Sequence, residues 1–183
     1  MVFSNRLKLT GTVETDETYL GGSEKGGKRG RGSENKAIVA IAVEVKGKLL
    51  GRVRMKVIDD VTGISLHAFV KDHIEPGVKL ITDAWPGYSG IENDGYTREV
   101  INQSKAENDD ELLPHVHMVV SLLKRWLLGT HQGAVGQKHL QAYLDEFVFR
   151  FNRRKSAKRG LLFYRLLENA MKVPPTTLDD LLN

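Results

Sequence analysis

Three carboxylates crowd into residues 11 to 22 of this sequence, GTVETDETYLGG, within a run of β-forming residues. On a β-strand, side chains alternate between faces, so Glu14 and Asp16 point one way and Glu17 points the other way. At least one of them is therefore expected to face a covered surface, where a carboxylate without a partner is costly. A bound metal ion is one partner that would explain the crowding. An edge strand with solvated acids is the alternative.

A further carboxylate, Asp83, follows the short apolar strand predicted over residues 78 to 82. Ligands of α/β sheets gather where strands end, which makes Asp83 the natural partner of an acid on the first strand. Two carboxylates on neighbouring strands are best explained by a divalent cation between them, because oxygen ligands suit Mg²⁺ and Mn²⁺. A turn residue before AWPGY is the alternative interpretation of Asp83.

The stretch HVHMVVSLLKRWLLG, residues 115 to 129, predicts an amphipathic helix that ends at Gly129. Its apolar side chains repeat at helical spacing and form a core stripe. His117 and Lys124 occupy the neighbouring face. Helices are also predicted over 62–73, with Thr62 as a possible cap, over 137–152, and over the stretch LLFYRLLENAM.

The elements that must position these residues begin with three antiparallel strands. The first is the acidic strand, and the next two, over 37–45 and 49–58, form a hairpin with one wet face. The strand over 78–82 comes after a helix and is predicted to be parallel to another strand. A last strand is predicted over 96–102.

The composition limits the class of protein. The chain of 183 residues fits one domain, and its 27 Lys and Arg against 23 Asp and Glu permit a polyanionic partner without demanding one. The absence of cysteine rules out disulfides, a thiol nucleophile and cysteine-ligated zinc. Without a signal peptide or a membrane-length apolar stretch in the sequence, a soluble cytoplasmic protein with no membrane partner is expected.

Two segments have the composition of a nucleic-acid contact. One is the glycine-rich basic loop over residues 21 to 36, and the other is RFNRRKSAKR, which contains no acid. Such clusters position phosphates without reading sequence, although a solvated helix end has a similar composition. Trp85 and Tyr88 are candidates for stacking on an unpaired base or for core packing. The predicted DNA-binding residues are Lys28, Arg29, Arg31, Arg150, Arg153, Arg154 and Lys155.

Four motifs in order, VETDETYLGG, LITDAWPGY, HVHMVVSLLKRWLLGTHQG and YLDEFVFRFNRR, resemble the transposase domain of bacterial insertion sequences, in the ISXO-like branch of the DDE superfamily. The resemblance implies an α/β, ribonuclease H-like fold, with a mixed sheet of three antiparallel strands plus parallel strands flanked by helices. It further implies an N-terminal remnant over 1–9, a catalytic domain over 10–167 and a C-terminal tail over 168–183.

The resemblance also implies the site. Asp16 takes the first catalytic position, Asp83 the second and His117 the third, and Lys124 follows His117 by seven residues, two helical turns later. The family usually has glutamate in the third position, and histidine is similar to a known variant. An exposed or core histidine is the alternative. Neither Glu14 nor Glu17 is predicted as a main ligand, although either could act behind the ligands, and His115 lies off the chosen face.

The chemistry implied is metal-dependent cleavage of DNA phosphodiesters followed by strand transfer, that is, DNA transposition. Two Mg²⁺ or Mn²⁺ ions held by Asp16, Asp83 and His117 would support it, with Lys124 positioning a phosphate. The expected partners are the element ends, the target DNA and further copies of the chain assembled on DNA, in the bacterial cytoplasm at the nucleoid. A catalytically silent DNA-binding remnant and a ribonuclease H-like nuclease that does not join strands are the alternatives.

Overall fold

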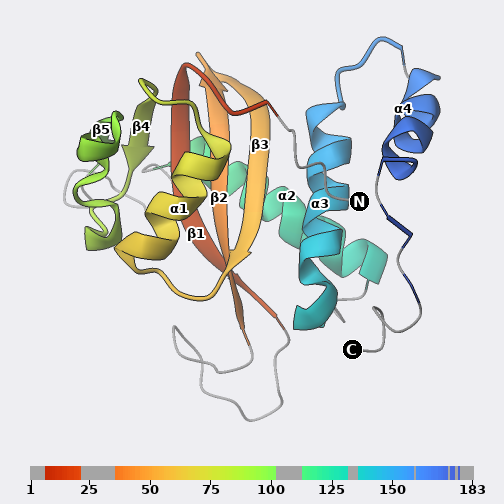
Figure 1. Ribbon diagram of the computed structural model, residues 1–183, viewed down its shortest axis with the longest axis horizontal. Coiled ribbons are helices and arrows are strands. Elements are labelled where there is room, and N and C mark those ends of the chain that lie inside the picture. Colours follow the sequence, from red (N-terminus) through yellow and green to blue (C-terminus); the bar gives the residue numbers. More distant parts are fainter. Residues whose placement is uncertain are drawn as a thin grey trace.

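A five-stranded mixed sheet, in the order β3-β2-β1-β4-β5, forms the centre of the molecule (Figure 1). Strands β1 (Thr12–Leu20), β2 (Ala37–Lys46) and β3 (Leu49–Ile58) are antiparallel, and β4 (Lys79–Thr82) and β5 (Thr97–Val100) continue the sheet parallel to β1. The predicted three antiparallel strands plus parallel strands are confirmed. This computed structural model describes residues 7–21, 36–101, 113–131, 136–158, 160–172, 174, 175 and 177.

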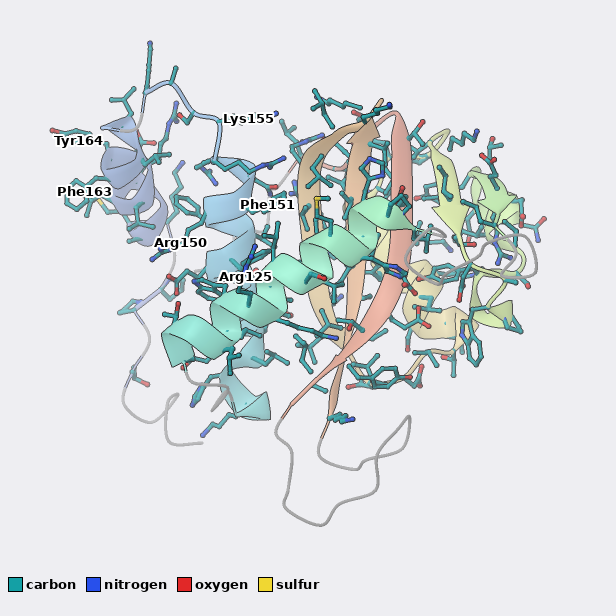
Figure 2. The ribbon with its side chains drawn as sticks, turned by 180° about the vertical axis from the view of Figure 1, so that it is seen from behind. Arg125, Arg150, Phe151, Lys155, Phe163 and Tyr164 are labelled. Carbon is teal, nitrogen blue, oxygen red and sulfur yellow. The ribbon has the colours of Figure 1, made fainter. Side chains whose placement is uncertain are left out.

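Helices cover both faces of the sheet. Helix α1 (Gly63–His73) packs on one face, and α2 (Pro114–His131) and α3 (Leu140–Asn152) pack on the other face (Figure 1). Short 3₁₀ turns occupy Pro86–Tyr88, Ile91–Asp94 and Gln137–His139. Helix α4 (Leu161–Ala170) lies beyond α3, away from the sheet, with its aromatic side chains exposed (Figures 1 and 2).

Strand β2 divides the apolar side chains between two cores. Val39, Ile41 and Val43 belong to the core that α2 and α3 cover, and the intervening Ala40 and Ala42 belong to the core that α1 covers. All five are fully buried, which explains why the sequence of this strand is almost continuously apolar. The smaller alanines on the α1 side leave room for the bulky side chains of that helix.

Helix α3 covers the free edge of β3 with polar side chains. The Asn152 side chain accepts a hydrogen bond from the Val53 N–H (2.8 Å) and donates one to the Val53 carbonyl (3.1 Å). Near the start of the same helix, the side-chain oxygen of Gln141 accepts a hydrogen bond from the Val57 N–H (2.9 Å). These contacts satisfy backbone groups that an edge strand would otherwise present to another chain.

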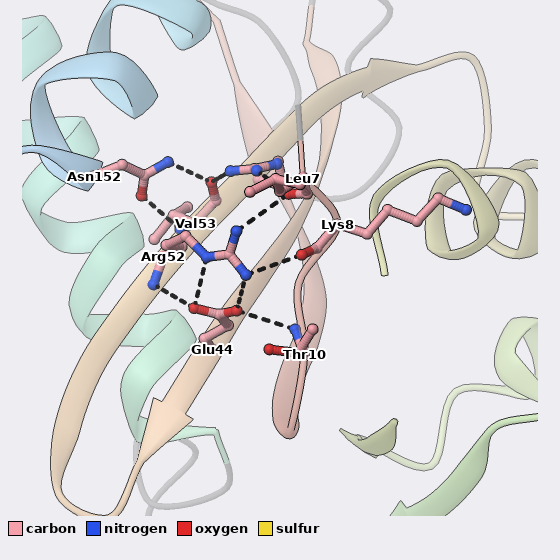
Figure 3. A network of polar contacts seen from close by, with 8 residues as sticks. Leu7, Lys8, Thr10, Glu44, Arg52, Val53 and Asn152 are labelled. Carbon is pink, nitrogen blue, oxygen red and sulfur yellow. Dashed lines mark hydrogen bonds and ion pairs between the residues drawn. The ribbon is translucent and has the colours of Figure 1, made fainter. Parts of the chain in front are cut away.

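A polar network fixes the segment before β1 to the antiparallel strands (Figure 3). The buried Glu44 carboxylate accepts hydrogen bonds from the Arg52 guanidinium and from the Thr10 N–H, and Arg52 also donates to the Lys8 carbonyl. Leu9 is fully buried and bridges to Ile74. The predicted N-terminal remnant over 1–9 therefore contains a core residue.

Several predicted boundaries differ from those observed. Helix α2 continues past Gly129 to His131, because a glycine late in a helix ends it only when its backbone turns left-handed. Thr62 precedes α1, but its hydroxyl donates to Asp60 (2.6 Å) instead of capping the helix. Helix α4 runs across the predicted boundary between 167 and 168. In the described part of the chain, no helix combines the length and apolar character that a membrane span requires.

Candidate active site

Strands β1 and β4 bring Asp16 and Asp83 to the same level of the sheet. The two strands pair in parallel, and Glu14 faces Ile81, so continuing that register by two residues sets Asp16 beside Asp83. Neighbouring strands lie about 4.8 Å apart, which puts the two backbones within reach of a shared ion. The sheet therefore juxtaposes the two predicted acids, as the parallel placement of the fourth strand requires.

Each of these carboxylates has one oxygen held by a backbone N–H close in sequence. The Glu17 N–H donates to Oδ1 of Asp16 (2.8 Å), and the Trp85 N–H donates to Oδ1 of Asp83 (3.0 Å). Both side chains are partly exposed. These hydrogen bonds restrict the rotation of the two carboxylates, so the acids are oriented before any ligand arrives.

The turn that carries Asp83 is fixed by Arg98 from the edge strand β5. Its guanidinium donates to the Asp83 carbonyl (3.1 Å), to the Trp85 carbonyl (3.1 Å) and to the Thr82 hydroxyl (2.9 Å). One planar cation thus satisfies three acceptors of the same turn, which a lysine could not do in this geometry. Arg98 was not singled out in the sequence, because an arginine on a predicted edge strand carries no distinguishing signal.

Tyr88 belongs to the core beneath the acids and does not stack on a base. It is fully buried, and its hydroxyl donates to Oε2 of Glu17 (3.3 Å). Burial raises the pKa of the Tyr88 hydroxyl well above its usual range, and the negative charges of Glu17, Asp16 and Asp83 raise it further. All three carboxylates therefore act on one buried group, which supports their proximity. Trp85 is partly buried, and its indole donates to the Val61 carbonyl (3.0 Å).

Helix α2 brings His117 to Asp16. Nε2 of His117 lies 3.5 Å from Oδ2 of Asp16, and both side chains are partly exposed. Two neighbouring ligands of an octahedral ion at about 2.1 Å lie about 3 Å apart, so this separation is close to what a shared ion needs. Lys124 is exposed on the same continuous helix, seven residues after His117. Among the described residues, no three His, Asp or Glu side chains gather closely enough to form a metal cluster.

A second carboxylate–imidazole pair lies beside the first. Glu14, which is 4% exposed, contacts Nδ1 of His115 through Oε1 (2.6 Å), and its Oε2 accepts the backbone N–H groups of His115 (2.9 Å) and Val116 (3.0 Å). Neither Glu14 nor His115 was predicted from the sequence as a ligand. The two-residue spacing of the acids on the strand and of the histidines on the helix was the available signal for paired contacts.

The basic residues near the end of α3 have differing surroundings (Figure 2). Arg150 pairs with Glu146 (2.7 Å), so an acid one turn before the acid-free segment RFNRRKSAKR supplies a counter-charge to its first arginine. The Arg154 guanidinium lies over the Phe151 ring, 3.9 Å from its centroid, and donates to the Gly51 carbonyl. Lys155 is exposed. The other predicted contacts, Lys28, Arg29 and Arg31, lie outside the described residues.

A mixed sheet in this order, with helices on both faces, acids on the central strand β1 and a further acid just after β4, is a ribonuclease H-like fold. A chain of the cryo-EM structure of the simian T-cell lymphotropic virus intasome in complex with PP2A regulatory subunit B56 gamma has the same fold, with a TM-score of 0.50. The two are 13% identical, and the similarity covers 79% of this chain and 49% of that chain, so this protein spans about half the length of its structural neighbour. At this identity the similarity shows the fold alone.

The sequence comparison identifies the family. The ISXO2-like transposase domain matches residues 8–152, which is most of the chain, and the protein therefore belongs to that family. The predicted membership of a DDE-type insertion-sequence transposase family is confirmed. No curated protein matches the chain.

Proposed function

We propose that this protein is the catalytic domain of a DDE-type transposase that cleaves DNA phosphodiesters with divalent metal ions and transfers the resulting strand ends. Family membership supports transposition as the general process. The observation that carries the finer proposal is the 3.5 Å separation of His117 from Asp16, whose strand β1 pairs with β4, the strand that Asp83 follows. His117 of α2 lies close to Asp16 of β1, and the parallel pairing of β1 with β4 supports placing Asp83 beside them.

The donor set of the site fits Mg²⁺ or Mn²⁺. Two carboxylates supply hard oxygen ligands, and a neutral imidazole adds a nitrogen ligand that favours Mn²⁺ over Mg²⁺. Asp16, Asp83 and His117 would hold the metal. When bound, a pair of such ions activates the attacking oxygen and stabilises the leaving oxygen of an in-line displacement at phosphorus.

The residues of the chain itself contribute orientation and charge. The backbone N–H groups on Oδ1 of Asp16 and Oδ1 of Asp83 hold both carboxylates in place. Lys124, two helical turns from His117 on the same helix, would contact a non-bridging phosphate oxygen and so hold the scissile group against the site. The buried Tyr88 hydroxyl, with its raised pKa, stays protonated and donates to Glu17 rather than entering the chemistry.

The DNA partner follows from the same proposal. We assign the element ends and the target DNA as substrates, bound by several copies of the chain in the bacterial cytoplasm at the nucleoid. Lys155 and Arg125 of α2 are exposed cations that would contact phosphates in this proposal. Arg154 is less suited, because its guanidinium already donates to backbone carbonyls of β3.

The test is a cleavage and joining assay on DNA that carries the element ends. We expect cleavage to need a divalent ion and to run faster with Mn²⁺ than with Mg²⁺. Asp16→Asn should abolish cleavage and His117→Ala should remove most of it. His117→Glu should retain activity and shift the preference toward Mg²⁺. The exposed Asp59→Asn is the matched control and should cleave normally.

The products distinguish the alternatives. Cleaved ends that never join to a target would indicate a nuclease without strand transfer. DNA binding without cleavage in any metal would indicate a silent remnant. Full cleavage by the His117→Ala variant would remove the histidine from the site.

A further inference from the structure

The first turn of α2 receives its cap from the strand that carries the first catalytic acid. A helix begins with backbone N–H groups that have no partner inside the helix. In α2 the first residue is Pro114, which has no N–H, and the His117 N–H already bonds the Leu113 carbonyl (3.0 Å). The two donors that remain, on His115 and Val116, both bond Oε2 of Glu14.

This cap is unusual because it joins segments far apart in sequence. Most helix caps come from the residue just before the helix. Glu14 lies 101 residues before His115, on β1, and its second oxygen contacts the His115 ring at 2.6 Å. The carboxylate therefore fastens the helix to the strand through three contacts, and its negative charge faces the positive end of the helix dipole.

The Glu14–His115 contact lies beside the candidate site. Glu14 and Asp16 are two residues apart on the same face of β1, and His115 and His117 are two residues apart on α2. The Glu14–His115 pair is largely buried and closed at 2.6 Å, whereas the Asp16–His117 pair is more exposed and open at 3.5 Å. A shift of α2 along β1 that changed the Asp16–His117 distance would first have to break the Glu14–His115 contact.

We propose that Glu14 is a positioning residue that holds the first turn of α2 against β1 and so sets the spacing between His117 and Asp16. The inference rests on the proposed metal-dependent function, because the spacing matters only if both residues share an ion. Glu14 itself contacts no reacting atom. Its carboxylate is needed because one oxygen accepts two N–H groups and the other accepts the ring, whereas a glutamine would turn an N–H₂ group toward one set of donors.

The test compares Glu14→Gln with Glu44→Gln in the full chain. Glu44 is a matched control, since it is also a buried carboxylate that accepts backbone N–H groups and a cationic side chain, but from Thr10 and Arg52. Two quantities are measured: amide hydrogen exchange in the first turn of α2, and the Mn²⁺ concentration that gives half-maximal DNA cleavage. Loss of an outer contact of this kind typically weakens metal binding or activity about 10- to 100-fold.

We expect Glu14→Gln to speed exchange at Val116 and His117 while Leu123 and Leu127 stay protected, and to raise the half-maximal Mn²⁺ concentration about 10-fold or more. Glu44→Gln should change neither quantity. Unchanged exchange in Glu14→Gln would overturn the docking role. Faster exchange with an unchanged Mn²⁺ requirement would overturn the positioning role.

Two further measurements, on the His115→Ala variant and on the unaltered protein, complete the test. His115→Ala removes only the ring contact and leaves both backbone contacts, so it should move both quantities in the same direction by less, and it serves if Glu14→Gln does not fold. An unchanged His115→Ala would then count against the proposal. If the unaltered protein cleaves no DNA with Mn²⁺, the proposed function fails, and the exchange measurement still decides whether Glu14 docks the helix.

Discussion

Replacing glycine by alanine should have opposite effects on the free energy of unfolding at Gly87 and at Gly129. Gly87 lies in the 3₁₀ turn after Asp83, and a Cβ built on it would come within 2.7 Å of the Val61 carbonyl and 2.7 Å of Cδ1 of Leu66. Gly129 lies in the last turn of α2, and a Cβ there would meet nothing within 4 Å. The two sites therefore separate crowding from backbone entropy.

The magnitudes follow from these surroundings. The new methyl group at Gly87 would also lie 2.8 Å from Nε1 of Trp85, between the indole and the Val61 carbonyl that it bonds. Overpacking costs about 1–3 kcal/mol and a lost hydrogen bond about 1 kcal/mol, so Gly87→Ala should lower the free energy of unfolding by about 2–4 kcal/mol. Gly129→Ala should raise it by about 0.5–1 kcal/mol, because alanine loses less backbone entropy in a helix.

Urea denaturation followed by circular dichroism measures both values. Since the turn around Gly87 also carries Asp83, the Gly87→Ala protein should additionally need more Mn²⁺ for cleavage at a temperature where it is still folded. Gly129→Ala should cleave normally. A Gly87→Ala protein as stable as the unaltered chain would refute the close packing of this turn against Val61 and with it the proposed rigidity around Asp83.

Three other residues give direct tests. Asn152→Ala should lower the free energy of unfolding by about 1–2 kcal/mol in urea denaturation, because the Val53 N–H loses its Asn152 acceptor while the Val53 carbonyl keeps the Arg54 guanidinium as a donor, and a loss below about 0.5 kcal/mol would contradict the edge contact. Burial raises the pKa of Glu44, but hydrogen bonds from Arg52 and Thr10 outweigh it and hold that pKa below its usual value. Its stabilisation is therefore complete above about pH 4.5 and lost as the pH falls through the lowered pKa, so Glu44→Gln should flatten thermal stability against pH in that acid range. Lys155→Ala should reduce the salt slope of DNA binding by about 1, and an unchanged slope would mean that Lys155 contacts no phosphate.

The sequence was sufficient for features that depend on local periodicity. Alternation predicted that Glu14 shares a face with Asp16 and that one acid is covered, and Glu14 is indeed buried. The mixed sheet and the placement of Asp83 after the fourth strand were also expected from the family resemblance. What the sequence could not predict were contacts between distant segments, such as Arg98 on the turn of Asp83, because pairing across 13 to 16 residues or more leaves no periodic signal.

The candidate site is held by its surroundings more than by its own residues. Two of the three elements that present a candidate site residue are fixed by a charged group from a different element: Arg98 of β5 holds the turn after β4, and Glu14 of β1 holds the start of α2. Each of these groups makes two of its three hydrogen bonds with backbone atoms, which do not change with the protonation or the ligands of the site. The backbone around the candidate site is consequently held in position by contacts within the protein, without any ligand. Preorganisation of this kind lowers the free-energy cost of assembling the site. The cap that Glu14 provides to α2, across 101 residues of sequence, therefore lies beside the Asp16–His117 pair whose spacing it would set.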